Sequence, residues 1–386
     1  MRNYIFVFFC MLFFSLCLMP SCAKEGGNSE KIRDSVYVYS LGEPVYVFDF
    51  IGQNRYAYCP SAIIREDGKA DVFFCGTPTP DICIDNIYYI VDNRNGTHST
   101  ERNVLQPSLS WDSHHNCDPS VIEGQFLYNE TTYRYAMFFL STPLDRYYNE
   151  VGVAFSNDLT TWIKYPQQIV KKTWMGDEDF PLGSGNLAWG CGQPSAVSLD
   201  KKGKVLLTYT IGDISGTRVV WSIFDMADMS KMEYTIPEKI PVDGLMNLDE
   251  TSKDYTCNCD FALCPEENKI LMIRPVHPHA VDYPTKIPSV EELCYMDYDK
   301  FLSGKGKWSR MVRLEQDATH FPRNHNSCIL RDSFGHLKDW HHPVVYYTIS
   351  QAEPQVTGGL QAEWTYTIYS VPVRSSFRYY YRKKIK

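Results

Sequence analysis

The sequence lacks the short motifs that mark several large enzyme classes. Its 386 residues contain no Gly-x-Ser-x-Gly elbow, Walker loop, Gly-x-Gly-x-x-Gly fingerprint or His-Glu-x-x-His motif. Basic residues are also few, with 38 Lys and Arg against 46 Asp and Glu, and they cluster only at residues 382–386. These absences weigh against motif-based esterase, kinase, dehydrogenase and zinc-protease mechanisms. Without a clustered basic surface to neutralise phosphates, we expect no nucleic-acid partner.

Long apolar runs are absent after the N-terminus. Residues 4–19 (YIFVFFCMLFFSLCLM) follow Arg2 and are too short for a comfortable membrane span, which indicates a secretory signal. The end of this run, Leu18 to Cys22, resembles a bacterial lipobox; an ordinary signal peptide with a chance Cys is the alternative. We predict a signal over 1–22, lipidation at Cys22 and a flexible tether over 23–35. The expected location is the cell envelope, at the outer membrane surface or the periplasmic face, with the lipid as the only membrane contact.

Zinc-type cysteine spacing is missing too. Ten of the 13 cysteines follow Cys22, and export permits disulfides, although the pairing cannot be read from sequence. Cys257-x-Cys259 with Cys264 lacks the paired spacing of a zinc site and lies along a strand pattern. We therefore expect no metal ligands and no cofactor, a structural channel cation such as calcium being the one exception considered.

Apolar strands dominate what is present. Tyr (27) and Phe (20) are abundant, and the best helix pattern is confined to 289–302, where Ser289 could cap a short helix. Five segments share a small or polar residue followed by an apolar strand, a polar turn and a second apolar strand. They begin at Cys59, Asp118, Gln193, Asp260 and Asn326. Their spacing of roughly 59 to 75 residues suits one four-stranded unit each. We predict an all-β fold, a single five-bladed β-propeller over 36–386, with 364–371 as its last strand.

The first strand of each propeller blade lines the central channel, so the residues that begin the five segments should converge at one mouth. Two of them, Asp118 and Asp260, are carboxylates. Paired carboxylates are what general acid and base work on a glycosidic bond requires.

The motifs at 117–122 (CDPSVI), 192–197 (GQPSAV) and 156–162 (SNDLTTW) resemble those of five-bladed glycoside hydrolases of the family 43 type, with families 32 and 117 as neighbours. The resemblance implies a catalytic base Asp on blade 1, an orienting Asp on blade 2 and an acid Glu on blade 3. Only the blade-2 residue carries over, onto Asp118. Cys59 stands where the base would be and Gln193 where the acid would be, so the family mechanism cannot be transferred unchanged.

We therefore expect a relocated set of catalytic carboxylates, namely Asp118, Asp260 and Glu178, the last in the acidic, aromatic-flanked loop at 174–190. Expected substrate-binding residues are Cys59, Asp85, His115, Gln193, Arg323, His325 and Trp189, whereas His277 fits a loop rim. The predicted function is hydrolysis of a complex polysaccharide or its oligosaccharides by a monomer, in the manner of an exo-acting furanosidase or xylosidase. The alternatives are a glycan-binding lipoprotein that has lost catalysis and, less favoured, a propeller that binds proteins.

Overall fold

The computed structural model describes residues 31–143, 148–171, 189–213, 216–278, 288–350 and 365–383, with side chains omitted for 31–35 and 379–383. Two compact units are present. Residues 37–376 form the first, and residues 1–36 with 377–386 form the second, whose described part consists of the outer ends of two strands. No helix among the described residues is long and apolar enough to cross a membrane.

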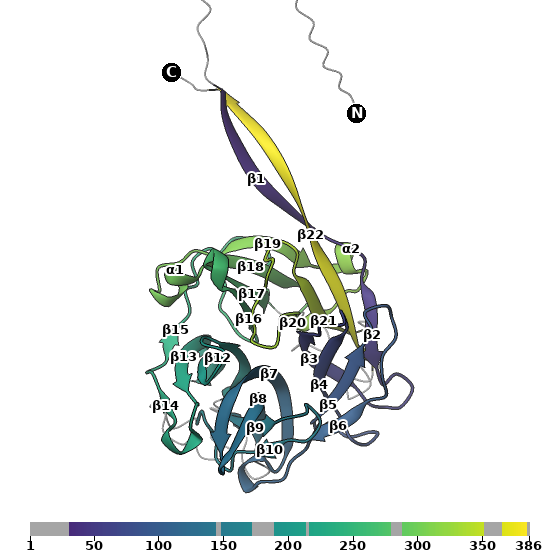
Figure 1. Ribbon diagram of the computed structural model, residues 1–386. Helices are drawn as coiled ribbons and strands as arrows, with labels where there is room; N and C mark the ends of the chain where they lie inside the picture. Colours follow the sequence, from purple (N-terminus) through teal and green to yellow (C-terminus); the bar gives the residue numbers. More distant parts are fainter. Residues whose placement is uncertain are drawn as a thin grey trace, which may run out of the picture. The chain divides into compact units, whose positions relative to one another are not determined.

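The first unit is a five-bladed β-propeller, which confirms the predicted fold class (Figure 1). Each of blades 1 to 4 is an antiparallel sheet built from consecutive strands. Blade 1 contains β3 (Ala57–Ile64), β4 (Ala70–Gly76), β5 (Asn86–Asp92) and β6 (Arg102–Leu105), and blade 2 contains β7 (His115–Tyr128), β8 (Thr131–Thr142), β9 (Glu150–Ser156) and β10 (Ile163–Lys164). Blade 3 contains β11 (Gly190–Ser198), β12 (Lys204–Asp213), β13 (Gly216–Asp225), β14 (Glu233–Tyr234) and β15 (Glu238–Lys239), and blade 4 contains β16 (Asp260–Cys264), β17 (Lys269–Pro275), β18 (Glu291–Asp297) and β19 (Ser309–Leu314).

Blade 5 joins the two ends of the chain. Its strands β20 (Asn324–Ile329), β21 (Val344–Ser350) and β22 (Tyr366–Lys383) come from the C-terminal part, while β1 (Lys31–Leu41) and β2 (Val45–Asp49) come from the N-terminal part and both pair with β22. The register aligns Val45 with Ser370 and Asp49 with Thr367. The last strand of the chain is therefore not the outer strand of its blade. Pairing between the termini closes the ring.

The hydrophobic core lies between the blades. Five clusters of buried side chains each join neighbouring blades, and the one between blades 5 and 1 contains Phe74 of β4, Tyr346 of β21 and Ile368 of β22. Both faces of a middle strand are covered in this arrangement, so every residue of β4 is buried. This explains why the middle strands are continuous apolar runs rather than alternating ones.

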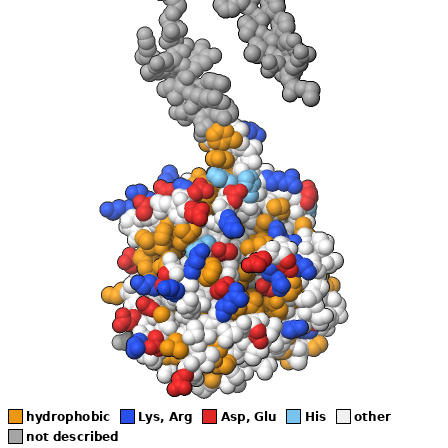
Figure 2. Space-filling model, viewed as in Figure 1, with side chains coloured by type: hydrophobic (Ala, Val, Ile, Leu, Met, Phe, Trp, Pro, Cys, Tyr) orange, Lys and Arg blue, Asp and Glu red, His pale blue; other side chains and the backbone are white. Residues whose placement is uncertain are grey.

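Helices are short in the described residues. They are α1 (Tyr298–Leu302), α2 (Gln316–Thr319) and three single turns, η1 (Ser110–Asp112), η3 (Met229–Lys231) and η4 (Pro265–Glu267). The helix expected over 289–302 is mostly strand: residues 291–297 form β18 and only the last five residues are helical. The correction has a physical reason, because β18 is an almost fully buried strand that pairs on both sides with β17 and β19. On the face drawn in Figure 2, Lys and Arg side chains are interspersed with Asp and Glu side chains.

Candidate active site

Five residues at equivalent places near the start of the blades share an unusual backbone conformation. We call Cys59, Asp118, Gln193, Asn258 and Asn326 the mouth ring; their φ angles are 50°, 48°, 51°, 46° and 48°. Asp and Asn tolerate this left-handed region better than most residues, whereas Cys59 and Gln193 do not. Strain of this kind persists only where the surrounding structure imposes it, and it is concentrated at functional sites.

In blade 4, the alignment of the five repeated segments was wrong by two residues. It predicts Asp260 at the mouth, but the structure puts Asn258 in the mouth ring and Asp260 two residues further along. In the first three blades, a Pro follows the mouth residue and marks the register. Cys259 replaces that Pro in blade 4, so the repeat could not be aligned correctly from sequence.

A second set of residues, two positions after the mouth ring, links the blades to one another. We call Ser61, Ser120, Ser195, Asp260 and Cys328 the inner ring. Ser61, Ser120 and Ser195 accept hydrogen bonds from the backbone N–H groups of Val121, Ala196 and Phe261, each in the next blade, at 3.4, 3.0 and 2.9 Å. Asp260 accepts from the Ile329 amide of blade 5 at 2.8 Å, and Cys328 interacts with the backbone of Ala62 of blade 1. The inner ring therefore makes contacts from each blade to the next.

Arg331 contacts three members of the inner ring, Ser120, Ser195 and Asp260. Its guanidinium is buried and donates to Ser120 Oγ at 3.0 Å, and it lies 3.5 Å from Asp260 Oδ1. Ser195 Oγ donates to the same Asp260 oxygen at 2.6 Å. The Asp260 carboxylate is thus engaged by Ser195, Ile329 and Arg331, and these contacts hold neighbouring blades together.

A cavity of about 710 Å³ opens over the mouth ring. Its described lining includes four members of the ring together with acids, imidazoles, aromatic rings and two free thiols: Tyr56, Tyr58, Cys83, Asp85, His114, His115, Cys117, Asp118, Leu140, Asn149, Trp189, Gln193, Cys257, Asn258, Pro275, Pro288, His325, Asn326 and Tyr366. A smaller cavity of about 30 Å³ lies between the two rings and is lined by Asp260. The volume of the larger cavity is typical of sites that bind small ligands.

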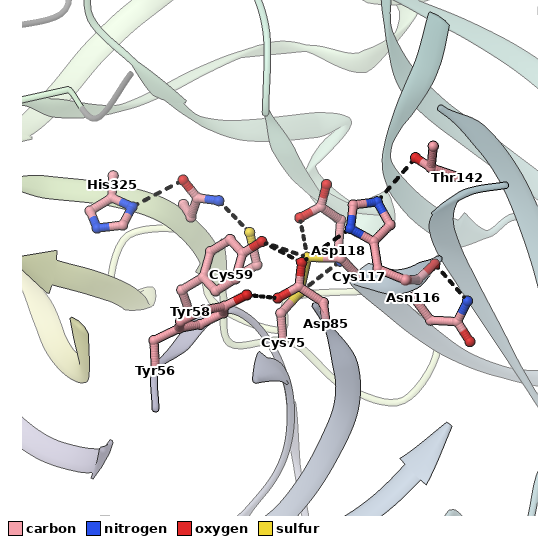
Figure 3. Close-up of a disulfide and its surroundings, with 12 residues drawn as sticks. Tyr56, Tyr58, Cys59, Cys75, Asp85, Asn116, Cys117, Asp118, Thr142 and His325 are labelled. Atoms are coloured by element: carbon pink, nitrogen blue, oxygen red, sulfur yellow. Dashed lines mark hydrogen bonds and ion pairs between the residues drawn. A yellow bond between two sulfur atoms is a disulfide. The ribbon is translucent and has the colours of Figure 1, made fainter. Parts of the chain in front are cut away.

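Asp85, just before β5, is buried at the edge of this cavity (Figure 3). Tyr56 and Tyr58 each donate a hydroxyl hydrogen bond to its carboxylate, at 2.7 and 3.1 Å. The ring nitrogen Nδ1 of His115 lies 3.4 Å from Asp85 Oδ2, the oxygen that also accepts from Tyr58. Burial alone would lower the pKa of His115, but the hydrogen bond and charge of Asp85 outweigh burial and raise it. Asp85 and His115 therefore interact directly, and both line the cavity.

Asp118 is the second acid of the cavity. Burial, together with the charge of Asp85, raises the pKa of its carboxyl to about 6, although a hydrogen bond from the Cys59 thiol opposes the shift. Burial and the negative charge of Asp118 in turn raise the pKa of Cys59, so that thiol stays protonated. Asn326 donates to the Cys59 sulfur from the opposite side. Asp118 is thus a carboxyl group that can give up a proton close to neutral pH.

A disulfide fastens blade 1 to blade 2 directly beside Asp118. It joins Cys75 of β4 to Cys117 of β7, and the Asp118 amide donates to the Cys75 sulfur at 2.9 Å. Donor atoms of Cys59, Cys75, Cys117 and Asp118 lie within 4.8 Å of one another, the one such grouping among the described residues. Two of these sulfurs are bonded to each other and so are not thiolate ligands.

The structure brings together most of the residues expected at the site. Asp118, Asp85, His115, Gln193, His325 and Trp189 line the larger cavity, and Cys59 lies beneath it in the mouth ring. Glu178 lies outside the described residues, as do Cys22 and the expected signal segment. Arg323 is buried, donates to Ser289 Oγ at 3.3 Å and is not among the described lining residues.

Several residues of the cavity were not anticipated. Tyr56 and Tyr58 hold Asp85, and Tyr366 stands beside His325, with ring centroids 4.9 Å apart. Tyr58 could have been found, because it immediately precedes the mouth residue Cys59. Tyr366 follows a segment without a repeat signature, and no pattern in the sequence points to it.

No protein-family model and no curated protein matches this chain. Solved structures do. An α-L-arabinofuranosidase from Podospora anserina, in complex with cellotriose, matches with a TM-score of 0.52 at 11% identity over 88% of this chain and 97% of its own. A family 117 glycoside hydrolase of the marine bacterium Zobellia galactanivorans matches with a TM-score of 0.52 at 10% identity over 87% and 90%. A family 93 α-L-arabinofuranosidase of Fusarium graminearum, in complex with arabinobiose, matches with a TM-score of 0.52 at 12% identity over 86% and 98%.

These likenesses show the fold. The three neighbours named here are glycoside hydrolases, and none of them is named as the family 43 type indicated by the sequence motifs. Family 117 is one of the neighbours that the motifs suggest.

Proposed function

We propose that the protein is a glycoside hydrolase that removes sugar residues from a complex polysaccharide or its oligosaccharides, in the manner of an exo-acting furanosidase or xylosidase. The observation that carries the proposal is the pair of acids, Asp85 and Asp118, in one cavity. Hydrolysis of a glycosidic bond uses one carboxyl group as proton donor and a second carboxylate as base or nucleophile. The arabinofuranosidases and the family 117 hydrolase among the structural neighbours support the proposal.

The environments of the two acids divide the roles between them. Asp118, with a pKa of about 6, is the proton donor to the leaving oxygen. Asp85 accepts from Tyr56 and Tyr58 and faces His115, so it is the second carboxylate. These three partners hold its orientation and limit its movement. The separation of the two acids when substrate is bound decides between retention and inversion.

The remaining lining of the cavity suits a sugar. Trp189 and Tyr366 offer aromatic faces, while Gln193, Asn258 and Asn326 offer amides for hydroxyl groups. A small number of polar groups among aromatic walls is the usual composition of a small-molecule site. The two-carboxylate reaction requires no cofactor. Because of this lining, a carbohydrate is the partner that we propose for the cavity.

We also propose that the protein is exported and anchored through a lipid on Cys22. The Cys75–Cys117 disulfide supports export, because disulfides persist in oxidising compartments. Globomycin, which blocks lipoprotein signal cleavage, should leave the precursor uncleaved in a bacterial host. Cleavage unaffected by the inhibitor would contradict the proposal.

Product release from glycans tests the hydrolase. Protein lacking residues 1–22 is incubated with a panel of plant, algal and microbial glycans, and released sugars are separated and quantified. Asp118→Asn should lower release at least about a hundredfold, the scale of a lost acid. Cys83→Ser, which alters a thiol of the same cavity, is the matched control and should keep full activity. Equal release by wild type and Asp118→Asn would contradict the proposal.

One observation favours the binding-only alternative. Gln193 stands where the resemblance puts an acid. Its Oε1 accepts a hydrogen bond from the backbone N–H of Asn258 at 2.9 Å, so this side chain is held by the fold. Saturable binding of a glycan by calorimetry, with no product from that glycan after prolonged incubation, would support this alternative over hydrolysis.

A further inference from the structure

A thiol, an imidazole and a carboxylate lie in line at the blade-4 side of the cavity. Cys257 Sγ is 3.4 Å from His277 Nε2, and His277 Nδ1 is 3.0 Å from Asp254 Oδ1. Cys257 precedes β16 and His277 follows β17, so blade 4 supplies all three groups. Cys257 lines the cavity, whereas Asp254 and His277 are buried behind it. None of the three takes part in the glycosidase chemistry proposed above.

The contacts around His277 fix its proton on one nitrogen. An ionised carboxylate only accepts hydrogen bonds, so Nδ1 donates to Asp254 and the lone pair of Nε2 faces the thiol. Asp254 is itself held by Arg274 Nη1 at 2.6 Å and by the His277 amide at 3.0 Å. Tyr255 stacks on the imidazole, with ring centroids 3.8 Å apart and an interplanar angle of 21°. The ring therefore cannot turn without losing several contacts.

We propose that Cys257, His277 and Asp254 form a nucleophilic triad that removes an acyl group from an O-acylated carbohydrate. The arrangement is that of a nucleophile, a base and a group that orients the base, which recurs on unrelated folds. The proposal goes beyond the glycosidase function, because it uses a different nucleophile, a different base and a different bond; only the carbohydrate part of its substrate rests on the proposed function.

The state of the thiol at rest decides how the step proceeds. Burial, followed by the charges of Glu291 and Asp254, raises the pKa of Cys257 to about 12, so the thiol is neutral until it reacts. His277 Nε2 must therefore take the proton while the sulfur attacks, as a general base does.

The chemistry balances without an oxidant or cofactor. The S–C bond forms at the ester carbonyl and the thiol proton moves to His277. The C–O bond then breaks, and His277 returns the proton to the sugar oxygen, which leaves as a hydroxyl. Water attacks the thioester with His277 again as base, the S–C bond breaks, the thiolate takes the proton back, and a carboxylic acid leaves.

Two mouth-ring residues with side-chain amides line the same cavity as Cys257, and we assign to them the stabilisation of the oxygen that becomes negative. Asn258 directly follows Cys257, and Gln193 lies beside it. Gln193 Oε1 accepts a hydrogen bond from the backbone N–H of Asn258, so Nε2 of Gln193 is the atom of its amide that can donate to a ligand. Side-chain amides serve as oxyanion donors in acyl transfer.

Acylation by p-nitrophenyl acetate tests the triad in the purified protein. Wild type should release p-nitrophenol in a burst and carry an acetyl thioester on the peptide that contains Cys257, found by mass spectrometry after acid quench. Cys257→Ala and His277→Gln should lower the burst rate at least about a hundredfold. Cys264→Ser, which alters a free thiol outside the lining of this cavity, should leave it unchanged.

Absence of an acetyl group on Cys257 in wild type, or a burst rate within twofold of wild type in Cys257→Ala, would overturn the proposal. Melting curves show whether each variant folds, and Cys257→Ser is the second variant should alanine unfold the blade. These outcomes do not depend on glycosidase activity, so the two proposals can fail separately.

The positioning role of Asp254 has its own readout, the alkylation of individual cysteines by iodoacetamide. Asp254→Asn removes a charge that raises the Cys257 pKa, which alone would speed alkylation, so the slower alkylation of Cys257 that we expect reports the loss of the oriented base. The buried Cys259 and Cys294 should stay as protected as in wild type. A purely structural role would instead expose those buried thiols and speed their alkylation. That result, or an unchanged rate at Cys257, would contradict the role.

Discussion

The two rings of the channel are only two residues apart along each blade, yet they have opposite characters. The mouth ring holds strained backbones and faces a cavity of about 710 Å³, whereas the inner ring makes hydrogen bonds from blade to blade. The carboxyl of Asp118 has a raised pKa, while Asp260 lies beside Arg331. A carboxylate in a propeller channel is therefore not by itself a catalytic candidate. Its hydrogen-bond partners decide whether it is available for catalysis or committed to the fold.

The largest expected effect is a loss of activity caused by a substitution in the cavity over the mouth ring. Asp85→Asn should lower the rate of glycoside hydrolysis about a hundredfold to ten-thousandfold, because the second carboxylate of the reaction is lost. Steady-state kinetics on the best glycan of the panel measure the loss. A variant with more than a tenth of wild-type activity would break the assignment of Asp85.

Removal of the inner-ring cation should instead affect folding. Arg331→Met leaves the partly buried Asp260 without its cation and Ser120 without a donor, which costs roughly 3–5 kcal/mol of unfolding free energy. Urea denaturation followed by tryptophan fluorescence measures the change. A loss under about 1 kcal/mol would mean that the inner ring does not hold the blades as argued.

The disulfide should have a somewhat smaller effect on stability. Cys75 and Cys117 are 42 residues apart, and loss of a crosslink closing a loop of this size costs about 2–4 kcal/mol. The double variant Cys75→Ser/Cys117→Ser, compared with Cys83→Ser in urea denaturation, gives the value. Equal stability of the two variants would show that the disulfide is dispensable for blade packing.

The smallest effect concerns pH. Asp118 has a higher pKa in the fold, about 6, than its ordinary 3.8, so the folded state binds the proton more tightly than the unfolded chain. The melting temperature should therefore fall slightly as the pH rises from about 4 to about 6, an effect that Asp118→Asn removes. Superposable pH profiles of wild type and Asp118→Asn would contradict the raised pKa.

The sequence predicts the architecture well because each blade buries the same kind of strand at a regular interval. It does not predict ring closure, because β2 has no repeat signature and its partner β22 is more than 300 residues away. The site is partly predictable: Asp85 could be chosen from the inner hairpin of blade 1 and His115 from the residues that precede Asp118, but the triad partner of Cys257 required the fold. Asp260 was misplaced because blade 4 has Cys259 in place of the Pro that follows the mouth residue in blades 1 to 3.

A side-by-side comparison of Asp118→Asn and Asp260→Asn tests the central claim most directly. Both variants remove one carboxylate from the channel by the same small change, and for each we would measure hydrolysis per folded molecule and unfolding free energy. The account predicts that Asp118→Asn loses at least about a hundredfold in activity with unchanged or higher stability, and that Asp260→Asn loses stability but keeps its activity per folded molecule. The reverse pattern, with activity lost in Asp260→Asn and kept in Asp118→Asn, would contradict it.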